Sequence, residues 1–369
     1  MKTITKVIGY PLMMAALFFY SESAQCQTVT TPRSASPASE ISQTIGLSEI
    51  TVNYSRPKLV SRAGVDRSGQ IWGQLVPYGF TTNFFGTEMP WRAGANENTI
   101  VTFSDDVKIE GKELAAGKYS LHMELFEDGK VTLIFSTNTT SWGSFYYKVE
   151  EDVLRVDVMS KATSKTNVLT YDFVDFGKDF TVLSLKWDEK EIPMRIELAT
   201  DDLMIQNIAN ELRDLPGFGW QGHLSAAQYT LTNNTHLDQG LAWVDIAVQR
   251  NPNFQTQTTK AGILNAMGKT TEANAIFDQL APTATIAQVN ALGYQFLGAK
   301  QYDKAIEFFE MNVKSDPDNA NTYDSLGDGY KANGDKELAI KNYRKALSLN
   351  PAANVRTASE ASLKELGAE

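Results

Sequence analysis

The sequence predicts a multidomain protein of the β plus α class, with an N-terminal antiparallel β-sandwich or barrel-like domain and a C-terminal α-helical repeat solenoid. Three observations predict this architecture. Hydrophobic and polar residues alternate between residues 41 and 198, the hydrophobic period becomes helical after Leu198, and one helical pattern then recurs every 34 residues. With 369 residues, 42% of them hydrophobic, the chain is long enough for two independent cores.

Residues 1–26 are typical of a secretory signal peptide. Lys2 and Lys6 precede an apolar run over 7–20, and small and polar residues follow it. The run is shorter than the roughly 20 residues that a membrane-spanning helix needs. We therefore expect a periplasmic or otherwise exported protein, while the sequence leaves the cleavage site open.

Cys26, the single cysteine of the chain, opens an alternative in which the protein is lipid-anchored at that residue. Gln25 argues against the anchor, because lipoprotein signals carry a small residue directly before the cysteine. We expect contact with a membrane only if Cys26 is lipidated. After it, residues 27–37 are small and polar and contain two prolines, which predicts a mobile leader.

An all-β domain is predicted over residues 38–198. Leu183, Leu185 and Trp187 alternate with Ser184 and Lys186, as expected of a strand with one buried face. Short strands divided by regular turns favour an antiparallel sandwich or a barrel. The predicted turns include residues 105–106, 110–112, 128–129 and 177–179.

The helical region begins with a predicted linker helix over 199–220 and ends with a capping helix over 354–369. Between them, residues 221–353 contain four predicted helical hairpins, two degenerate and two clear, and Lys260 occupies a position where a large apolar residue is expected. The spacing of the clear copies is typical of tetratricopeptide repeats, which stack into a binding surface. The matching residues are Val289, Leu292, Gly293, Phe296, Ala305, Phe309 and Pro317 in one copy, and Tyr323, Leu326, Gly327, Tyr330, Ala339, Tyr343 and Pro351 in the next.

Short motifs also make the β region similar to a known family. They include Ile-Thr-Val-Asn-Tyr-Ser-Arg-Pro at 50–57, Trp-Arg-Ala-Gly-Ala-Asn-Glu at 91–97 and Ala-Gly-Lys-Tyr-Ser-Leu at 116–121. On these residues the region from 38 to 198 resembles the family called domain of unknown function 2911. The resemblance implies an exported β domain, joined in some members to tetratricopeptide repeats, and implies no reaction because the family has none assigned.

Composition and motifs argue against several functional classes. The net charge is −10 at pH 7, whereas nucleic acid requires a basic face, so we expect no nucleic-acid partner. The only histidines, His122, His223 and His236, do not have the spacing of a zinc site. The sequence contains no nucleophile elbow and no glycine-rich phosphate loop. We therefore expect no catalytic residues, no cofactor and no metal.

The segment 55–98 is the best candidate for a ligand site, because it is long and has little periodicity. Arginine forks and aromatic faces suit an anionic or sugar-containing ligand. The basic residues of the segment, Arg56, Lys58, Arg62, Arg67 and Arg92, outnumber the acidic ones. The candidate ligand-binding residues are Arg56, Trp72, Tyr78, Trp91, Arg92, Asn96 and Glu97. A plainer interpretation, which we favour, is that the aromatic residues plug the open end of the sandwich and that Arg92 pairs with Glu97.

The repeats predict a second surface, the groove lined by the first helix of each hairpin. Few positive charges face it, so a terminal carboxylate of a peptide would find little to clamp it. A mixed contact with a protein or peptide partner, or packing against the chain itself, fits better. The predicted groove residues are Asn290, Tyr294, Asn321, Asp324, Asp328 and Lys331.

Together these patterns predict an exported binding or scaffold protein of the cell envelope that uses its repeats for protein–protein interaction and catalyses no reaction. The alternative is a sugar- or anion-binding module, or an enzyme, with its site in the segment 55–98.

Overall fold

The structure of the protein is a computed structural model that describes residues 35–368. The chain divides into two compact units, one ending at Leu198 and one beginning at Ala199. The predicted signal peptide (1–26), with Cys26, and residues 27–34 of the predicted leader lie outside the described residues. The predicted fold class, an antiparallel β domain followed by α-helical repeats, is confirmed, although no sheet among the described strands closes into a barrel.

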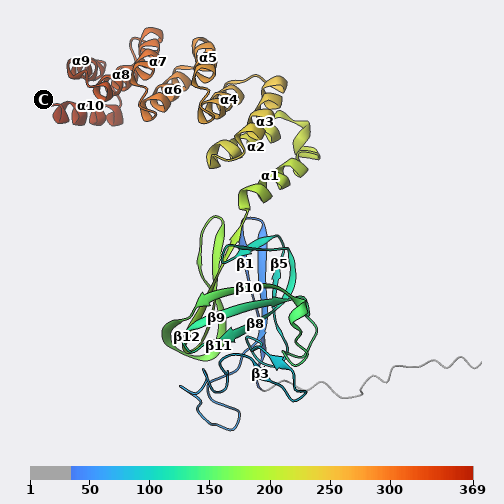
Figure 1. Ribbon diagram of the computed structural model, residues 1–369. Coiled ribbons are helices and arrows are strands. Elements are labelled where there is room, and N and C mark those ends of the chain that lie inside the picture. Colours follow the sequence, from blue (N-terminus) through green and yellow to red (C-terminus); the bar gives the residue numbers. More distant parts are fainter. Residues whose placement is uncertain (1–34, 369) are drawn as a thin grey trace, which may run out of the picture. The chain divides into compact units, whose positions relative to one another are not determined.

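The β unit contains two main antiparallel sheets and one short hairpin (Figure 1). The six-stranded sheet has the order β1-β2-β5-β8-β9-β10, the four-stranded sheet has the order β11-β12-β6-β7, and β3 pairs with β4. The strands are β1 (Ala38–Ile45), β2 (Ser48–Ser55), β3 (Thr81–Thr82), β4 (Glu88–Met89), β5 (Thr99–Phe103), β6 (Val107–Ile109), β7 (Lys112–Leu114), β8 (Gly117–Leu125), β9 (Lys130–Ser136), β10 (Asp152–Met159), β11 (Lys161–Phe176) and β12 (Phe180–Leu198).

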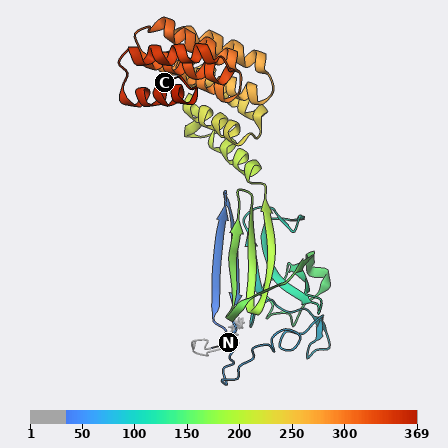
Figure 2. The ribbon, with the colours of Figure 1, turned by 90° about the vertical axis from the view of Figure 1, so that its left-hand side faces the viewer.

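One hydrophobic core lies between the two sheets. Ile50 and Val52 of β2 and Leu183 and Leu185 of β12 are buried in the same cluster, so alternate residues of both sheets point inward. The hydrogen-bonded ladders connect within each sheet and not from one sheet to the other, which makes the unit a sandwich. The segment between β2 and β5 gathers at one end of the strands in both views (Figure 1, Figure 2).

The ladder between β11 and β12 contains a bulge beside that end, with the extra residues on β11. The pairing of β11 with β12 changes register around Asp188, whose φ of 53° lies in the left-handed region. The buried Asp188 carboxylate accepts a hydrogen bond of 2.8 Å from the backbone N–H of Gly69. The bulge therefore ties the segment between β2 and β5 to β12, next to the buried Trp187.

The helical unit consists of a leading helix, four hairpins and a final helix. Its first part, predicted as a linker helix, contains α1 (Thr200–Glu211) and a short 3-10 turn, Leu215–Phe218. The final helix, α10 (Ala353–Glu365), follows the last hairpin. None of the described helices is long and apolar enough to cross a membrane. The hairpins are α2 (Trp220–Asn233) with α3 (Leu237–Arg250), α4 (Phe254–Ala266) with α5 (Thr270–Leu280), α6 (Ile286–Gly298) with α7 (Tyr302–Ser315), and α8 (Ala320–Asn333) with α9 (Lys336–Ser348).

Glycine and aromatic residues at matched positions set how closely the helices of the clear hairpins approach. A Cβ atom placed on Gly293 would lie 2.4 Å from Cε1 of Phe309, and one on Gly327 would lie 2.6 Å from Cε1 of Tyr343. Both rings are fully buried, so a larger residue in place of either glycine would force the helices apart. In the second hairpin, Lys260 pairs with Asp245 of α3 at 2.7 Å, which explains how a charged residue is accommodated there.

Candidate functional site

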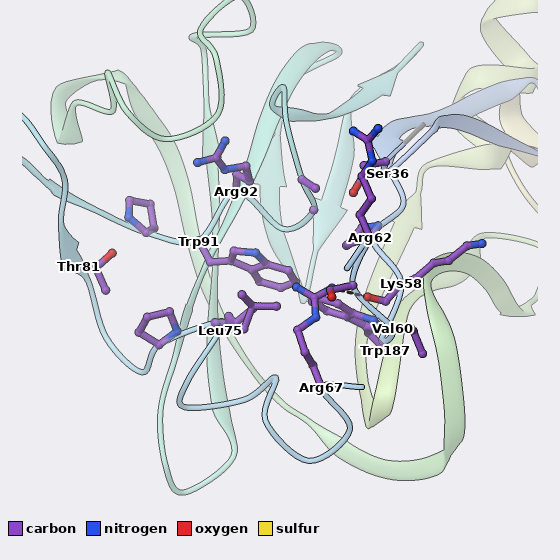
Figure 3. Close-up of a pocket in the computed structure, with 18 of the residues that line it drawn as sticks. Ser36, Lys58, Val60, Arg62, Arg67, Leu75, Thr81, Trp91, Arg92 and Trp187 are labelled. Atoms are coloured by element: carbon purple, nitrogen blue, oxygen red, sulfur yellow. Dashed lines mark hydrogen bonds between the residues drawn. The ribbon is translucent and has the colours of Figure 1, made fainter. Parts of the chain in front are cut away.

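A cavity of about 840 Å³ opens at the end of the β-sandwich where the segment 55–98 gathers. This volume falls within the roughly 300–1,000 Å³ usual for small-molecule sites. Most of its wall comes from the segment 55–98. Trp187 of β12, far from this segment in the sequence, also lines the cavity. Figure 3 shows Trp91 near the centre of this wall.

Each of the two sheets holds one half of the segment in place. Leu59 donates from its backbone N–H to the carbonyl of Asn167 on β11 at 2.8 Å, next to a bridge between Lys58 and Val168. On the other side, Trp91 and Met123 of β8 exchange two backbone hydrogen bonds of 2.8 and 2.9 Å. The cavity is therefore bounded by two stretches of irregular chain that regular strands fix.

The charges around the cavity are all positive. Lys58, Arg62, Arg67 and Arg92 line it, and no aspartate or glutamate lines the part of the wall that the structure describes. In the view of Figure 3, Lys58, Arg62 and Arg67 lie on one side of Trp91 and Arg92 lies on the other. The arrangement produces a positive potential inside an acidic protein.

Lys58 and Arg62 are exposed at the mouth of the cavity. Arg62 lies at the tip of a small loop in which Ser61 donates its backbone N–H to the carbonyl of Val65 at 2.8 Å and Val60 pairs with Asp66. Among the described residues, neither Lys58 nor Arg62 forms an ion pair. Their side chains therefore keep their hydrogen-bond donors available.

Arg67 and Arg92 are half-buried and held by backbone carbonyls. Arg67 donates from Nε to the carbonyl of Leu59 at 3.1 Å and from Nη2 to the carbonyl of Lys58 at 2.6 Å. Arg92 donates from Nη1 to the carbonyl of Asn96 at 2.7 Å, and its guanidinium lies 4.8 Å from the ring centre of Phe145. Burial lowers the pKa of Arg92. These two guanidinium groups have fixed positions, unlike the side chains at the mouth.

Three indole rings form the apolar part of the wall and its support. Trp72 stands edge-on to Trp91, with ring centres 5.7 Å apart, and edge-on to Trp187 at 6.1 Å. Trp91 and Trp187 line the cavity, while Trp72 packs behind them against the core. The indole nitrogens of Trp72 and Trp187 are buried without a hydrogen-bond partner in the described part of the chain.

Two of the seven predicted ligand-binding residues, Trp91 and Arg92, line the cavity, and the other five do not. Arg56 donates to the carbonyl of Leu169 at 3.1 Å and to Oγ1 of Thr170 at 2.8 Å, so it anchors the segment to β11. Trp72 and Tyr78 pack against the hydrophobic core. Asn96 donates to the carbonyl of Ser36 at 3.1 Å, and Glu97 accepts from Oγ of Ser55 at 3.3 Å.

Sequence reasoning did not name Lys58, Arg62, Arg67 and Trp187 as site residues. The first three belong to the basic excess of the segment 55–98, which was the available signal. Trp187 carried no such signal because it lies in a regular alternating strand, where an aromatic residue is expected to pack in the core. The plainer interpretation holds for Trp72 and Tyr78, which pack, while Arg92 bonds to Asn96.

A second cluster of polar side chains is buried near β8. Nδ1 of His122 lies 3.0 Å from Oγ of Ser144, and the ring stands edge-on to Tyr147. Burial, with a smaller contribution from the charge of Arg92, lowers the pKa of His122 to about 4. The imidazole is therefore neutral at pH 7. The described residues contain no group of three or more His, Cys, Asp or Glu residues that could hold a metal ion.

In the helical unit, the predicted groove residues of the last repeat contact other parts of the chain. Asp328 accepts hydrogen bonds of 2.7 Å from the hydroxyls of Tyr294 and Tyr343. Burial, together with the charge of Asp328, raises the pKa of both phenols.

The final helix α10 bonds to the other two charged groove residues of that repeat. Asp324 accepts a hydrogen bond from Ser359, and Lys331 pairs with Glu365 at 2.5 Å. The carboxylate of Asp324 is buried, which raises its pKa. Asn321 remains exposed, and Asn290 is half-buried with its side-chain oxygen unpartnered in the described residues. The open part of the groove therefore carries mainly uncharged groups.

Comparison with known proteins gives two family matches. Residues 36–196 match the family described as Protein of unknown function (DUF2911), and residues 320–352 match a tetratricopeptide repeat, so the resemblance expected from the sequence is confirmed. The comparison with curated proteins finds no match.

Solved structures of MamA are similar to part of the chain. MamA 41-end from Desulfovibrio magneticus RS-1 is 20% identical over 40% of this chain and 90% of that chain, with a TM-score of 0.28. Another crystal structure of MamA is 18% identical over 41% of this chain and 89% of that chain, with a TM-score of 0.31. Scores this low carry no argument about function. The chain is thus similar to the DUF2911 family over residues 36–196 and to a tetratricopeptide repeat over residues 320–352.

Proposed function

We propose that this protein is an exported binding or scaffold component of the cell envelope, which holds a protein or peptide partner through its helical repeats. The observation that carries the proposal is the array of four hairpins, one of which matches a tetratricopeptide repeat. Hairpins of this kind stack into an extended surface, and such surfaces bind other proteins.

The chemistry of the open groove supports an uncharged stretch of peptide as the ligand. Tyr294 is 39% exposed, and Asn290 and Asn321 lie on the same line of predicted groove positions. The amides of Asn290 and Asn321 donate and accept hydrogen bonds, as a peptide backbone requires, and Tyr294, whose hydroxyl is bonded to Asp328, offers its ring. Lys331 is already paired with Glu365, so a free terminal carboxylate has no unpaired cation at that position.

Export is supported by the sequence alone. Lys2 and Lys6 followed by the apolar run over 7–20 are the features that direct secretion. We place the mature protein in the periplasm or outside the cell, with attachment through a lipid at Cys26 as the alternative. Fractionation of cells tests this: the processed chain is expected outside the cytosol, and an unprocessed chain in the cytosol would contradict export.

Site-specific crosslinking in cells tests the groove. A photoreactive residue in place of Ala287, which is exposed on α6 one helical turn before the groove residue Asn290, is expected to give a discrete adduct with one partner protein. The matched control carries the same residue in place of Lys341, which is exposed on α9. An adduct pattern at Ala287 that equals the pattern at Lys341 would count against a partner in the groove.

A further inference from the structure

We propose that the cavity of the β-sandwich is a binding site for a small organic anion, a sugar-sized molecule that carries carboxylate or phosphate groups. The proposal concerns a different domain from the repeats and stands independently of the function proposed for them. It is carried by the charge of the wall, the polar groups that the wall lacks, and the rigid support of the residues that line it.

The charge of the wall selects an anion. Four cationic side chains surround one cavity without a carboxylate among the described lining residues. Cations gathered in this way repel one another, so the arrangement is unfavourable unless a ligand or counter-ion neutralises it. Lys58 and Arg62, which have no ion-pair partner in the described residues, supply the donors at the mouth.

The scarcity of hydrogen-bond acceptors among the side chains of the wall argues against an uncharged sugar as the ligand. Sugar hydroxyls need partners that accept as well as donate, and the side chains that usually serve are Asp, Glu, Asn and Gln. None of these four types lines the described wall of the cavity, whose neutral polar side chains are the three hydroxyls of Ser36, Ser61 and Thr81. A carboxylate or phosphate accepts hydrogen bonds only, and guanidinium and ammonium groups match it.

The apolar wall defines the body of the ligand. Trp91 presents an indole at the centre of the cavity, beside the Arg67 side chain, as Figure 3 shows. An indole face packs against the C–H face of a sugar ring or against a flat aromatic ring. Trp72, edge-on behind Trp91 at 5.7 Å, keeps this indole in position.

The wall is built before any ligand arrives. Two backbone carbonyls hold Arg67, and the buried Asp188 carboxylate holds the adjacent loop through the N–H of Gly69 at 2.8 Å. Fixed donors lose little conformational entropy on binding, which favours affinity. The site therefore combines hydrogen-bonded cations inside with exposed cations at the mouth.

The test is calorimetric titration of the mature full-length protein with three sugar probes that differ in charge. Trigalacturonate carries carboxylates, glucose 1,6-bisphosphate carries phosphates, and maltotriose is uncharged. Binding of at least one anionic probe is expected, weakening as ionic strength rises, with no binding of maltotriose. Binding of trigalacturonate alone assigns a carboxylate ligand, and binding of the bisphosphate alone assigns a phosphate ligand.

Variants at the mouth separate the cavity from general surface charge. Arg62→Gln combined with Lys58→Gln is expected to weaken anion binding about tenfold or more, because charge-assisted hydrogen bonds are lost. Lys118→Gln, an exposed lysine of β8 outside the cavity, serves as the matched control and is expected to change nothing. Thermal unfolding of each variant verifies folding.

Three results would overturn the proposal. They are failure of both anionic probes to bind the wild-type protein at millimolar concentration, equal binding of maltotriose, and equal weakening by Lys118→Gln. Each leaves the crosslinking result at Ala287 unaffected, so the two proposals fail separately.

Discussion

The cavity of the β-sandwich and the groove of the repeats differ in whether their charged side chains have partners within the chain. Lys58 and Arg62 face the cavity without ion-pair partners in the described chain, whereas Asp328 and Lys331 in the groove bond to groups of the same chain. A charged side chain without a partner in the chain is available to a ligand and contributes little to stability. A charged side chain that is hydrogen-bonded within the chain contributes to stability and is less available to a ligand. This difference is the basis for proposing an uncharged partner for the groove and an anionic ligand for the cavity.

The largest expected effect tests the internal bonding of the groove. Asp328→Ala removes the acceptor shared by Tyr294 and by the fully buried Tyr343. The buried hydroxyl of Tyr343 then loses its acceptor and that of Tyr294 keeps only Oγ of Ser325 at 3.2 Å, so we expect a loss of about 2–4 kcal/mol in the free energy of unfolding of the helical unit. Urea unfolding followed by circular dichroism measures it. Asp328→Asn, which keeps one acceptor oxygen, is the control, and a loss below about 0.5 kcal/mol for Asp328→Ala would break the comparison.

A slightly smaller effect comes from the buried imidazole of the β unit. The pKa of His122 is lowered from 6.5 to about 4 in the folded state, so the unfolded chain binds an additional proton between these pH values. Stability is therefore present above pH 6.5 and decreases as the pH falls toward 4. One pKa unit corresponds to about 1.4 kcal/mol, which gives a loss on the order of 2–3 kcal/mol.

The His122→Gln variant isolates this contribution from that of the carboxylates. Its free energy of unfolding should depend less steeply on pH between 4 and 6.5 than that of the wild-type protein. Identical pH profiles for the two proteins would show that His122 does not titrate as its burial predicts.

The bulge that supports the cavity is expected to have a moderate effect. Asp188→Ala removes the acceptor for Gly69 and places alanine at a φ of 53°. Each change costs about 1 kcal/mol, so we expect a loss of about 2 kcal/mol in the β unit and weaker anion binding. Asp188→Asn keeps an acceptor and tolerates this φ, and it should retain most of both properties. Equal losses for the two variants would remove the role assigned to the hydrogen bond.

The smallest expected effect concerns the exposed cations of the cavity. Arg62→Gln and Lys58→Gln should change the free energy of unfolding by less than about 0.5 kcal/mol, because neither side chain has an ion-pair partner to lose. Relief of repulsion among the four cations favours a small gain over a loss. Thermal unfolding measures this, and a clear loss of stability would show that these residues support the fold.

Periodicity allowed most of the fold to be predicted. The alternation of Leu183, Leu185 and Trp187 placed a strand with one buried face, and the recurring Gly293 and Gly327 placed two close helix pairs. The predicted turns at 105–106, 128–129 and 177–179 fall between strands, and the turn at 110–112 does so except for Lys112, the first residue of β7. Local patterns of this kind survive folding because the same side chains that create them become the core.

The cavity lies in the predicted segment, although five of the seven predicted ligand-binding residues do not line it. The segment 55–98 provides most of the cavity wall, but Arg56, Asn96 and Glu97 turn toward hydrogen bonds within the chain. Composition shows that cationic side chains are present. It does not show which of them donate hydrogen bonds to a neighbouring strand in the folded protein. Arg56 and Arg62 look equivalent in sequence, and only pairing with β11 separates them.

The sequence by itself determined the division into strands and helices, the two cores and the basic excess of one long segment, because these depend on residue type and spacing along the chain. Tertiary structure alone decided that Trp187 and Trp91 line one cavity, with Trp72 edge-on to both, and that α10 bonds to Asp324 and Lys331 of the last repeat. Both depend on contacts between residues far apart in the chain, whose distances are set by how sheets and helices pack and not by any local pattern.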